Sequence, residues 1–148
     1  MSILNIFDLT GKLALVTGAS RGIGRGIAEA LARAGADILG VSASLSPTGS
    51  DVETAIKKIG KNFEGFKVDF SKRDQLHYFV ENLKNKKIVP DILINNAGTI
   101  KRNSAENHPT EWWDEVIEVN LSSQFLLSRE IGRAVSYTHL RAHETSGY

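Results

Sequence analysis

The sequence has 148 residues, a formal net charge of +1, 41% hydrophobic residues and no cysteine. That length suits one globular domain with a buried core. The balanced charge excludes nucleic-acid binding by bulk electrostatics and argues against disorder. Without cysteine there are no disulfides, thiolate metal sites or cysteine nucleophile. The N-terminus does not have the pattern of a secretory signal, and no apolar run approaches the ~20 residues of a membrane span. We therefore expect a cytoplasmic protein with no membrane or nucleic-acid partner.

Short apolar runs alternate with helical patterns along the chain. The apolar runs predict strands over residues 12–17, 37–41, 63–69 and 91–95. The helical patterns predict helices over 22–34 and 51–59, a third helix capped by Ser71, and a long helix capped by Thr110 that continues through Leu127. This alternation predicts an α/β fold with a doubly wound parallel sheet of strand order 3-2-1-4, because each parallel crossover is right-handed.

The end of the chain has a different pattern. The helical apolar period lapses after Arg133, and residues 135–148 resemble the translation of a sequencing-library adapter, a recurrent artefact of gene assembly. We expect residues 1–134 to form an incomplete domain and residues 135–148 to be a non-native tail. His139 and His143 have the spacing of neighbours on a helix, but a third ligand is missing, so we expect no metal site.

A glycine-rich turn, Thr17–Gly24, links the first predicted strand to the first helix. Gly18 permits a tight exit from the strand, Gly22 lets backbone N–H groups approach a pyrophosphate, and Gly24 allows close helix–strand contact. The helix N-terminus adds unpaired N–H donors and a partial positive charge. The alternative is a glycine-rich turn that binds no ligand, and the strand–turn–helix context favours the phosphate-binding interpretation.

Three motifs together resemble the short-chain dehydrogenase/reductase family. The turn has that family's Gly-x-x-x-Gly-x-Gly spacing, Asn95–Gly98 reads Asn-Asn-Ala-Gly after the fourth strand, and Asn120 lies in the long helix. The motifs follow the family's order, and the match covers residues 9–134. The resemblance implies a Rossmann-like fold, hydride transfer to or from NAD(P), and assembly of the full-length protein as a homo-tetramer.

The resemblance also implies roles for individual residues. Cofactor contacts are expected from the turn and the ends of the strands, namely from Gly18, Ser20, Arg21, Gly22, Ile23, Gly24, Asp69, Asn95, Ala97 and Gly98. The local pattern adds Ser42, at the end of the second strand. Asp69 would bond the adenine edge, and the segment Asn95–Gly98 would line the cofactor cleft and brace the sheet. Asn120 would be the asparagine of the catalytic tetrad and hold a water in the proton relay.

The serine, tyrosine and lysine of that tetrad have no counterpart in the sequence. Tyr137 is followed by Arg141 where the family's Tyr-x-x-x-Lys motif has lysine, and it comes too soon after Asn120. Arginine stays protonated and does not replace that lysine well. We therefore assign Tyr137 no catalytic role and expect the chain as written to be inactive.

The choice between NAD and NADP has support on both sides. The second strand ends at Ser42 without the acid that binds a ribose 2′-hydroxyl, and Arg21 could meet a 2′-phosphate, which favours NADP. The segment after Gly98, with Lys101 and Arg102, resembles the branch of the family that acts on deoxy-keto sugar acids, whose members generally use NAD. We expect NAD or NADP, with NAD ahead. Lys101 and Arg102 could bind a substrate carboxylate; the alternative is a solvated loop.

These observations predict an oxidoreductase that moves a hydride between NAD(P) and a small-molecule deoxy-keto sugar acid, similar to a 2-deoxy-D-gluconate 3-dehydrogenase. One alternative is a 3-oxoacyl carrier-protein reductase, which the glycine-rich turn and the acid-free second strand also suit. The other is a dinucleotide-binding module without catalytic activity.

Overall fold

A computed structural model of the chain describes residues 3–144, with side chains described for residues 5–137. The chain divides into two compact units. Unit 1 consists of Met1–Asp69 with Asp91–Gly98, and unit 2 consists of Phe70–Pro90 with the residues from Thr99 onward. Within the described residues, no helix is long and apolar enough to cross a membrane.

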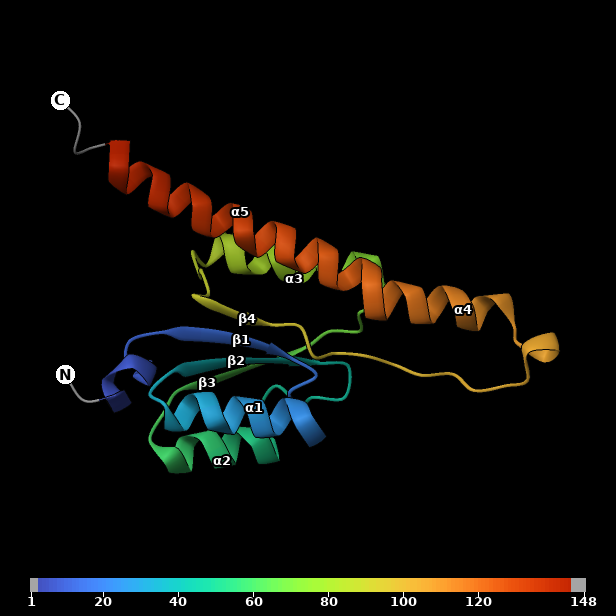
Figure 1. The fold of residues 1–148 in the computed structure, drawn as a ribbon, viewed down its shortest axis with the longest axis horizontal. Helices are drawn as coiled ribbons and strands as arrows, with labels where there is room; N and C mark the ends of the chain where they lie inside the picture. The colour runs from blue at the N-terminus through green and yellow to red at the C-terminus, as the bar shows by residue number, and fades with distance from the viewer. Residues whose placement is uncertain (1–2, 145–148) are drawn as a thin grey trace. The chain divides into compact units, whose positions relative to one another are not determined.

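Unit 1 contains a parallel four-stranded sheet (Figure 1). Its strands are β1 (Leu13–Thr17), β2 (Asp37–Ser42), β3 (Phe63–Lys67) and β4 (Ile92–Ile94). The order is β3-β2-β1-β4, with Leu15 of β1 in register with Leu39 on one side and Leu93 on the other. The predicted strand order and the Rossmann-like fold are therefore confirmed.

Two helices of unit 1, α1 (Gly22–Arg33) and α2 (Asp51–Ile59), lie side by side on one face of this sheet (Figure 1). The buried face of α1 is made of the small residues Gly24, Ala28 and Ala32. Small side chains let the helix backbone approach the sheet closely, so that α1 holds the glycine-rich turn against the end of β1. A short 3₁₀ turn, η1 (Ile3–Phe7), precedes the sheet.

Unit 2 is helical. It contains α3 (Arg73–Asn85), a 3₁₀ turn η2 (Ala105–Asn107), α4 (Thr110–Ile117), a π-helical turn η3 (Glu118–Ser122) and α5 (Ser123–Glu144). The predicted caps Ser71 and Thr110 are wrong, because Lys72 and Pro109 hold the N-cap positions. The sequence pattern also gave no sign of the π-helical turn. The backbone of α5 stays helical past Arg133, after which the apolar period lapses.

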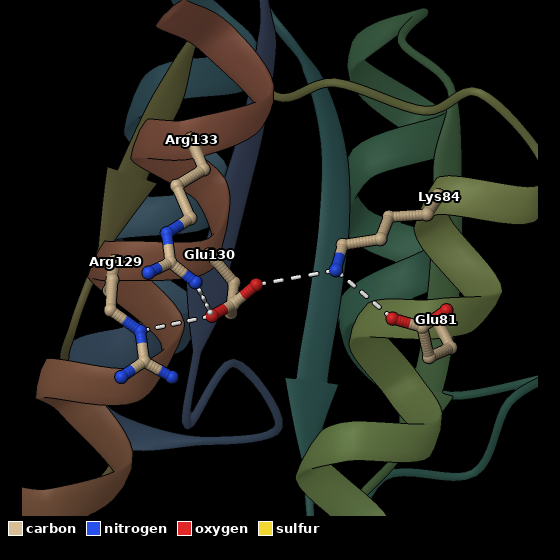
Figure 2. A network of polar contacts seen from close by, with 5 residues as sticks. All are labelled: Glu81, Lys84, Arg129, Glu130 and Arg133. Carbon is tan, nitrogen blue, oxygen red and sulfur yellow. Dashed lines mark hydrogen bonds and ion pairs between the residues drawn. The ribbon is translucent and has the colours of Figure 1, made fainter. Parts of the chain in front are cut away.

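An ion-pair network joins α3 to α5 (Figure 2). The carboxylate of Glu130 pairs with Arg129 at 3.0 Å, Arg133 at 3.1 Å and Lys84 at 3.3 Å. Lys84 also pairs with Glu81 at 3.0 Å. Burial acts to raise the pKa of Glu130, but the hydrogen bonds from Arg129 and Lys84 outweigh it and hold that pKa below its usual value. The network therefore links the two helices through a carboxylate that is stabilised in its charged form.

Candidate functional site

The glycine-rich turn of unit 1 packs directly on the loop that follows β4. Gly18 has a φ of +67°, and a β-carbon there would lie 2.7 Å from Asn96 Nδ2. A β-carbon on Gly24 would lie 2.1 Å from the Gly18 carbonyl oxygen. Neither position can therefore carry a side chain. Because both residues are glycines, the N-terminus of α1, the end of β1 and the loop after β4 can pack closely and form one cradle.

The N-terminus of α1 opens into space. Its N-cap residue, Arg21, makes no side-chain capping hydrogen bond, and Arg21, Gly22 and Ile23 are exposed. Gly22 has a φ of +57°, and a β-carbon there would meet no atom within 4 Å. The first N–H groups of a helix have no intrahelical acceptor. An anionic phosphate is the ligand that suits such a helix end.

The hydroxyl of Thr17 ties the end of β1 to the loop after β4. It accepts hydrogen bonds from the backbone N–H groups of Asn96 at 3.0 Å and Ala97 at 2.9 Å, and it donates to the Ile94 carbonyl at 3.2 Å. The Asn96 side chain completes the tie by donating to the Thr17 carbonyl at 3.1 Å. The sequence predicts that the segment Asn95–Gly98 braces the sheet, but it indicates no role for Thr17. In the structure, the side chains of Thr17 and Asn96 make these bracing hydrogen bonds.

Three serine hydroxyls meet at the carboxyl ends of β1 and β2. Ser20 Oγ lies 3.1 Å from Ser42 Oγ and 2.9 Å from Ser44 Oγ, and the last two are 3.3 Å apart. Ser42 is buried, whereas Ser44 is exposed. No carboxylate contacts this cluster in the described part of the chain. The sequence predicts Ser20 and Ser42 as cofactor contacts but does not indicate Ser44, which a turn brings back beside them.

All the residues expected to contact a cofactor lie in unit 1. Asp69 is half-buried shortly after β3, Asn95 is exposed directly after β4, and Gly98 is exposed at the end of the same loop. In a parallel sheet the carboxyl ends of all strands meet at one edge. This edge is where an open α/β sheet binds its ligands.

Asn120 lies in unit 2, within the π-helical turn η3. Its side-chain Oδ1 accepts the Thr99 N–H at 2.8 Å, and its Nδ2 donates to the Thr99 carbonyl at 2.9 Å. The carboxamide thus holds the backbone of one residue through both of its polar ends. Its Oδ1 retains one free lone pair, and its Nδ2 retains one free N–H.

The two expected substrate cations, also in unit 2, have different surroundings. Lys101 Nζ lies 3.1 Å from Glu115 Oε2 and 5.8 Å from the centre of a Trp112 ring. Arg102 is exposed and makes no ion pair or hydrogen bond with another described residue. Lys101 is therefore held by α4, whereas the guanidinium of Arg102 is available to an anion.

No cluster of histidine and acidic side chains that could hold a metal ion is found among the described residues. The side chains of His139 and His143 lie outside the described residues. Tyr137 is 62% exposed on α5.

The sequence profile of the short chain dehydrogenase family matches residues 12–139. Among curated proteins, the chain is 58% identical to a 2-dehydro-3-deoxy-D-gluconate 5-dehydrogenase of Pseudoalteromonas atlantica, over 88% of this chain and 52% of the relative. It is 46% identical to the Bacillus subtilis protein of that name (86% and 49%) and 38% identical to a 3-oxoacyl-[acyl-carrier-protein] reductase of Escherichia coli (86% and 51%). The chain spans about half the length of the curated relatives it matches.

A solved structure described as an NAD(P)-dependent gluconate 5-dehydrogenase of Beutenbergia cavernae, with NADP bound at low occupancy, matches with a TM-score of 0.78 and 38% identity. The match covers 86% of this chain and 50% of that one. A short-chain dehydrogenase/reductase of Mycobacterium marinum matches with the same TM-score of 0.78 at 31% identity, over 90% of this chain and 54% of that one. The profile, the relatives and the fold agree, and this chain belongs to the short-chain dehydrogenase family.

Proposed function

We propose that the full-length protein is an NAD(P)-dependent oxidoreductase that dehydrogenates a deoxy-keto sugar acid. The observation that carries the proposal is the glycine cradle, in which a β-carbon on Gly24 would lie 2.1 Å from the Gly18 carbonyl oxygen. Together with the open N-terminus of α1, this cradle fits the pyrophosphate of a dinucleotide. When bound, the nicotinamide cofactor accepts or supplies the hydride.

The surroundings of Ser42 favour NADP over NAD, which reverses the order expected from the sequence. Ser20, Ser42 and Ser44 offer three hydroxyls and no acid at the carboxyl ends of β1 and β2, and Arg21, which directly follows Ser20, is exposed. Hydroxyls and a guanidinium suit a 2′-phosphate, whereas NAD sites place an acid on the 2′-hydroxyl. The NADP in the Beutenbergia cavernae structure supports this preference.

The cofactor preference is tested by substituting Ser42 with aspartate in the full-length protein. A carboxylate there would accept from a ribose 2′-hydroxyl and repel a 2′-phosphate. We expect Ser42→Asp to raise the ratio of kcat/KM with NAD to kcat/KM with NADP. An unchanged ratio in a folded variant would show that Ser42 does not face the ribose.

Arg102 is the residue we assign to the substrate carboxylate. Lys101 is engaged with Glu115 at 3.1 Å, whereas Arg102 has no partner among the described residues. Arginine also offers a planar pair of donors that matches a carboxylate. We expect Arg102→Ala to raise KM for the sugar acid by about 10- to 100-fold, because a charge-assisted hydrogen bond contributes about 1.5–3 kcal/mol. KM for an uncharged analogue should stay unchanged. Equal effects on both substrates would contradict the assignment.

The position of oxidation follows from the names of two relatives. The Pseudoalteromonas atlantica and Bacillus subtilis relatives are both named 2-dehydro-3-deoxy-D-gluconate 5-dehydrogenases, so we propose oxidation at C5 instead of C3. Asn120 would act in the proton relay, because its carboxamide keeps one lone pair and one N–H free to hold a water. The homo-tetramer that the family resemblance implies stays a prediction, which light scattering by the full-length protein tests.

A second candidate function is reduction of a 3-oxoacyl thioester. The 38% identity to the Escherichia coli 3-oxoacyl-[acyl-carrier-protein] reductase favours it, as does the acid-free end of β2. Comparing kcat/KM of the full-length protein for 2-dehydro-3-deoxy-D-gluconate and for an acetoacetyl thioester separates the two functions. We expect the sugar acid to be the better substrate. Cofactor binding without turnover of either compound would instead indicate a non-catalytic dinucleotide-binding module.

A further inference from the structure

The π-helical turn η3 needs a side chain to complete its hydrogen bonding. The backbone N–H of Ser123 donates to the carbonyl of Glu118, five residues earlier, instead of to that of Val119 as in an α-helix. The Val119 carbonyl therefore loses its usual α-helical partner. The hydroxyl of Ser123 takes that place by donating to it at 2.7 Å, in a buried position.

A residue of α3 binds the first residue of the same turn. Glu118, its first residue, accepts two hydrogen bonds from the guanidinium of Arg73, one of them from Nε at 2.9 Å. Such a two-bond pair fixes orientation as well as distance. The Glu118 side chain is 19% exposed and that of Arg73 is 55% exposed, so the carboxylate of the pair is partly shielded from solvent. Arg73 thus holds the point at which the helix leaves its α-helical register.

The register of this turn decides where Asn120 points. An α-helix advances about 100° per residue, so loss of the one-residue widening would rotate Asn120 by about that angle relative to α5. Its carboxamide would then leave the backbone of Thr99, which it holds at 2.8 and 2.9 Å. Thr99 lies three residues before Arg102, so the same contact also locates the segment that carries the proposed substrate cation.

We propose that Ser123 and the Arg73–Glu118 ion pair are positioning residues for Asn120: they hold the π-helical turn in the register at which Asn120 binds the backbone of Thr99. The inference rests on the proposed function in that it assigns Asn120 to the proton relay. It adds that a hydroxyl and an ion pair that touch no substrate set the position of that residue.

The first test needs no substrate. It follows amide hydrogen exchange in the full-length protein at the Thr99 N–H, which Asn120 protects. Ser123→Ala and Arg73→Gln should each speed exchange at Thr99 by about fivefold or more, since loss of a net hydrogen bond of ~1 kcal/mol or more opens the site by that factor. Exchange at the Ala97 N–H, which Thr17 protects, should not change. Unchanged protection of Thr99 in both variants would overturn the proposal.

Two further serine variants supply the matched comparison. Ser123→Thr keeps the hydroxyl and should restore slow exchange at Thr99. Ser122→Ala makes the same chemical change one residue earlier, where the hydroxyl has no hydrogen bond among the described residues, and should behave like the wild type. If Ser122→Ala and Ser123→Ala have equal effects, helix propensity and not the Val119 hydrogen bond is responsible, and the proposal is wrong.

The kinetic test is a double-mutant cycle with Asn120. We expect Ser123→Ala to lower kcat about tenfold or more with KM for the cofactor unchanged, because a misplacement of ~1 Å can cost about 100-fold. In an Asn120→Ala background the same change should have no further effect on kcat, since it acts through Asn120. Additive effects would overturn the proposal while leaving the relay role intact. An Asn120→Ala variant with full kcat would contradict the relay role and the proposal together.

Discussion

The hydroxyl of Thr17 accepts the backbone N–H of Ala97 at 2.9 Å, across 80 residues of sequence. It also accepts the neighbouring N–H of Asn96 at 3.0 Å, so one buried oxygen serves two amides of the loop after β4. Because Asn96 also lies against the adjacent Gly18, the glycine-rich turn is held directly against the loop after β4.

Replacing Thr17 with valine removes these bonds without changing the volume of the side chain. We expect Thr17→Val to lower the free energy of unfolding of the full-length protein by about 2 kcal/mol, because the Ala97 N–H loses its acceptor and the Asn96 N–H keeps only the Ile94 carbonyl. Affinity for NAD(P) should fall as well. Thr54→Val is the control, since its hydroxyl donates to Ser50 at an exposed site, and should change stability by about 0.5 kcal/mol or less. Chemical denaturation measures both; equal losses would contradict the role of Thr17.

Gly24 and Gly26 lie on the same helix and should respond in opposite ways to alanine. A β-carbon on Gly24 would lie 2.1 Å from a carbonyl oxygen, whereas one on Gly26 meets no atom within 4 Å. We expect Gly24→Ala to destabilise the full-length protein by about 3 kcal/mol or more through overpacking and to abolish dinucleotide binding. Gly26→Ala should stabilise it by about 0.5–1 kcal/mol. Denaturation midpoints and calorimetric titration with NADP check both, and a tolerated Gly24→Ala would rule out the close contact.

Lys87 is the non-glycine residue with a positive φ, +55°, among the described residues. It follows α3, where its N–H donates to Lys84 and that of Ile88 donates to Leu83, the pattern of a left-handed helix end that favours glycine. We expect Lys87→Gly to raise the free energy of unfolding by about 0.5–1 kcal/mol, because L-residues are strained in this conformation. Lys87→Ala keeps the strain and should give no gain. A gain from alanine would instead implicate the lysine charge.

The α3–α5 network should make the protein acid-sensitive. Hydrogen bonds from Arg129 and Lys84, acting against burial, hold the pKa of Glu130 below its usual 4.5, so the folded state favours the carboxylate. The stability that this contributes is present above the unfolded pKa and is lost as pH falls from about 4.5 through the lower folded pKa. We expect Glu130→Gln to flatten the decline of stability in that window. A wild-type slope in the variant would show that the network contributes nothing there.

The sequence predicted unit 1 well because its signals are local. Apolar runs mark the four strands, and the spacing of Gly18, Gly22 and Gly24 marks the turn between β1 and α1. Contacts between residues far apart in the sequence have no such local signal and could not be predicted from it. Nothing adjacent to Thr17 indicates that it meets Ala97, and Ser44 joins Ser20 only because the chain folds back after β2.

Unit 2 shows a second limit. The apolar pattern of the long helix predicts α4 and α5, but it does not reveal the π-helical turn, because that turn is defined by backbone hydrogen bonds and not by residue type. The sequence pattern likewise does not indicate the ion pair between Lys101 and Glu115. Sequence reasoning therefore treated Lys101 and Arg102 as equivalent cations, and the contacts of α4 distinguish them.

The most direct test of the proposed function identifies the carbon that the full-length protein oxidises. The protein is incubated with NADP⁺ and 2-dehydro-3-deoxy-D-gluconate labelled with ¹³C at C5, and carbon NMR follows the label, with Gly24→Ala as the inactive control. Loss of the C5 hydrogen as hydride and of the hydroxyl hydrogen as a proton converts the alcohol carbon to a carbonyl. We expect a labelled carbonyl signal that grows in step with reduced cofactor. A folded, cofactor-binding protein that leaves the C5 alcohol signal unchanged would contradict it.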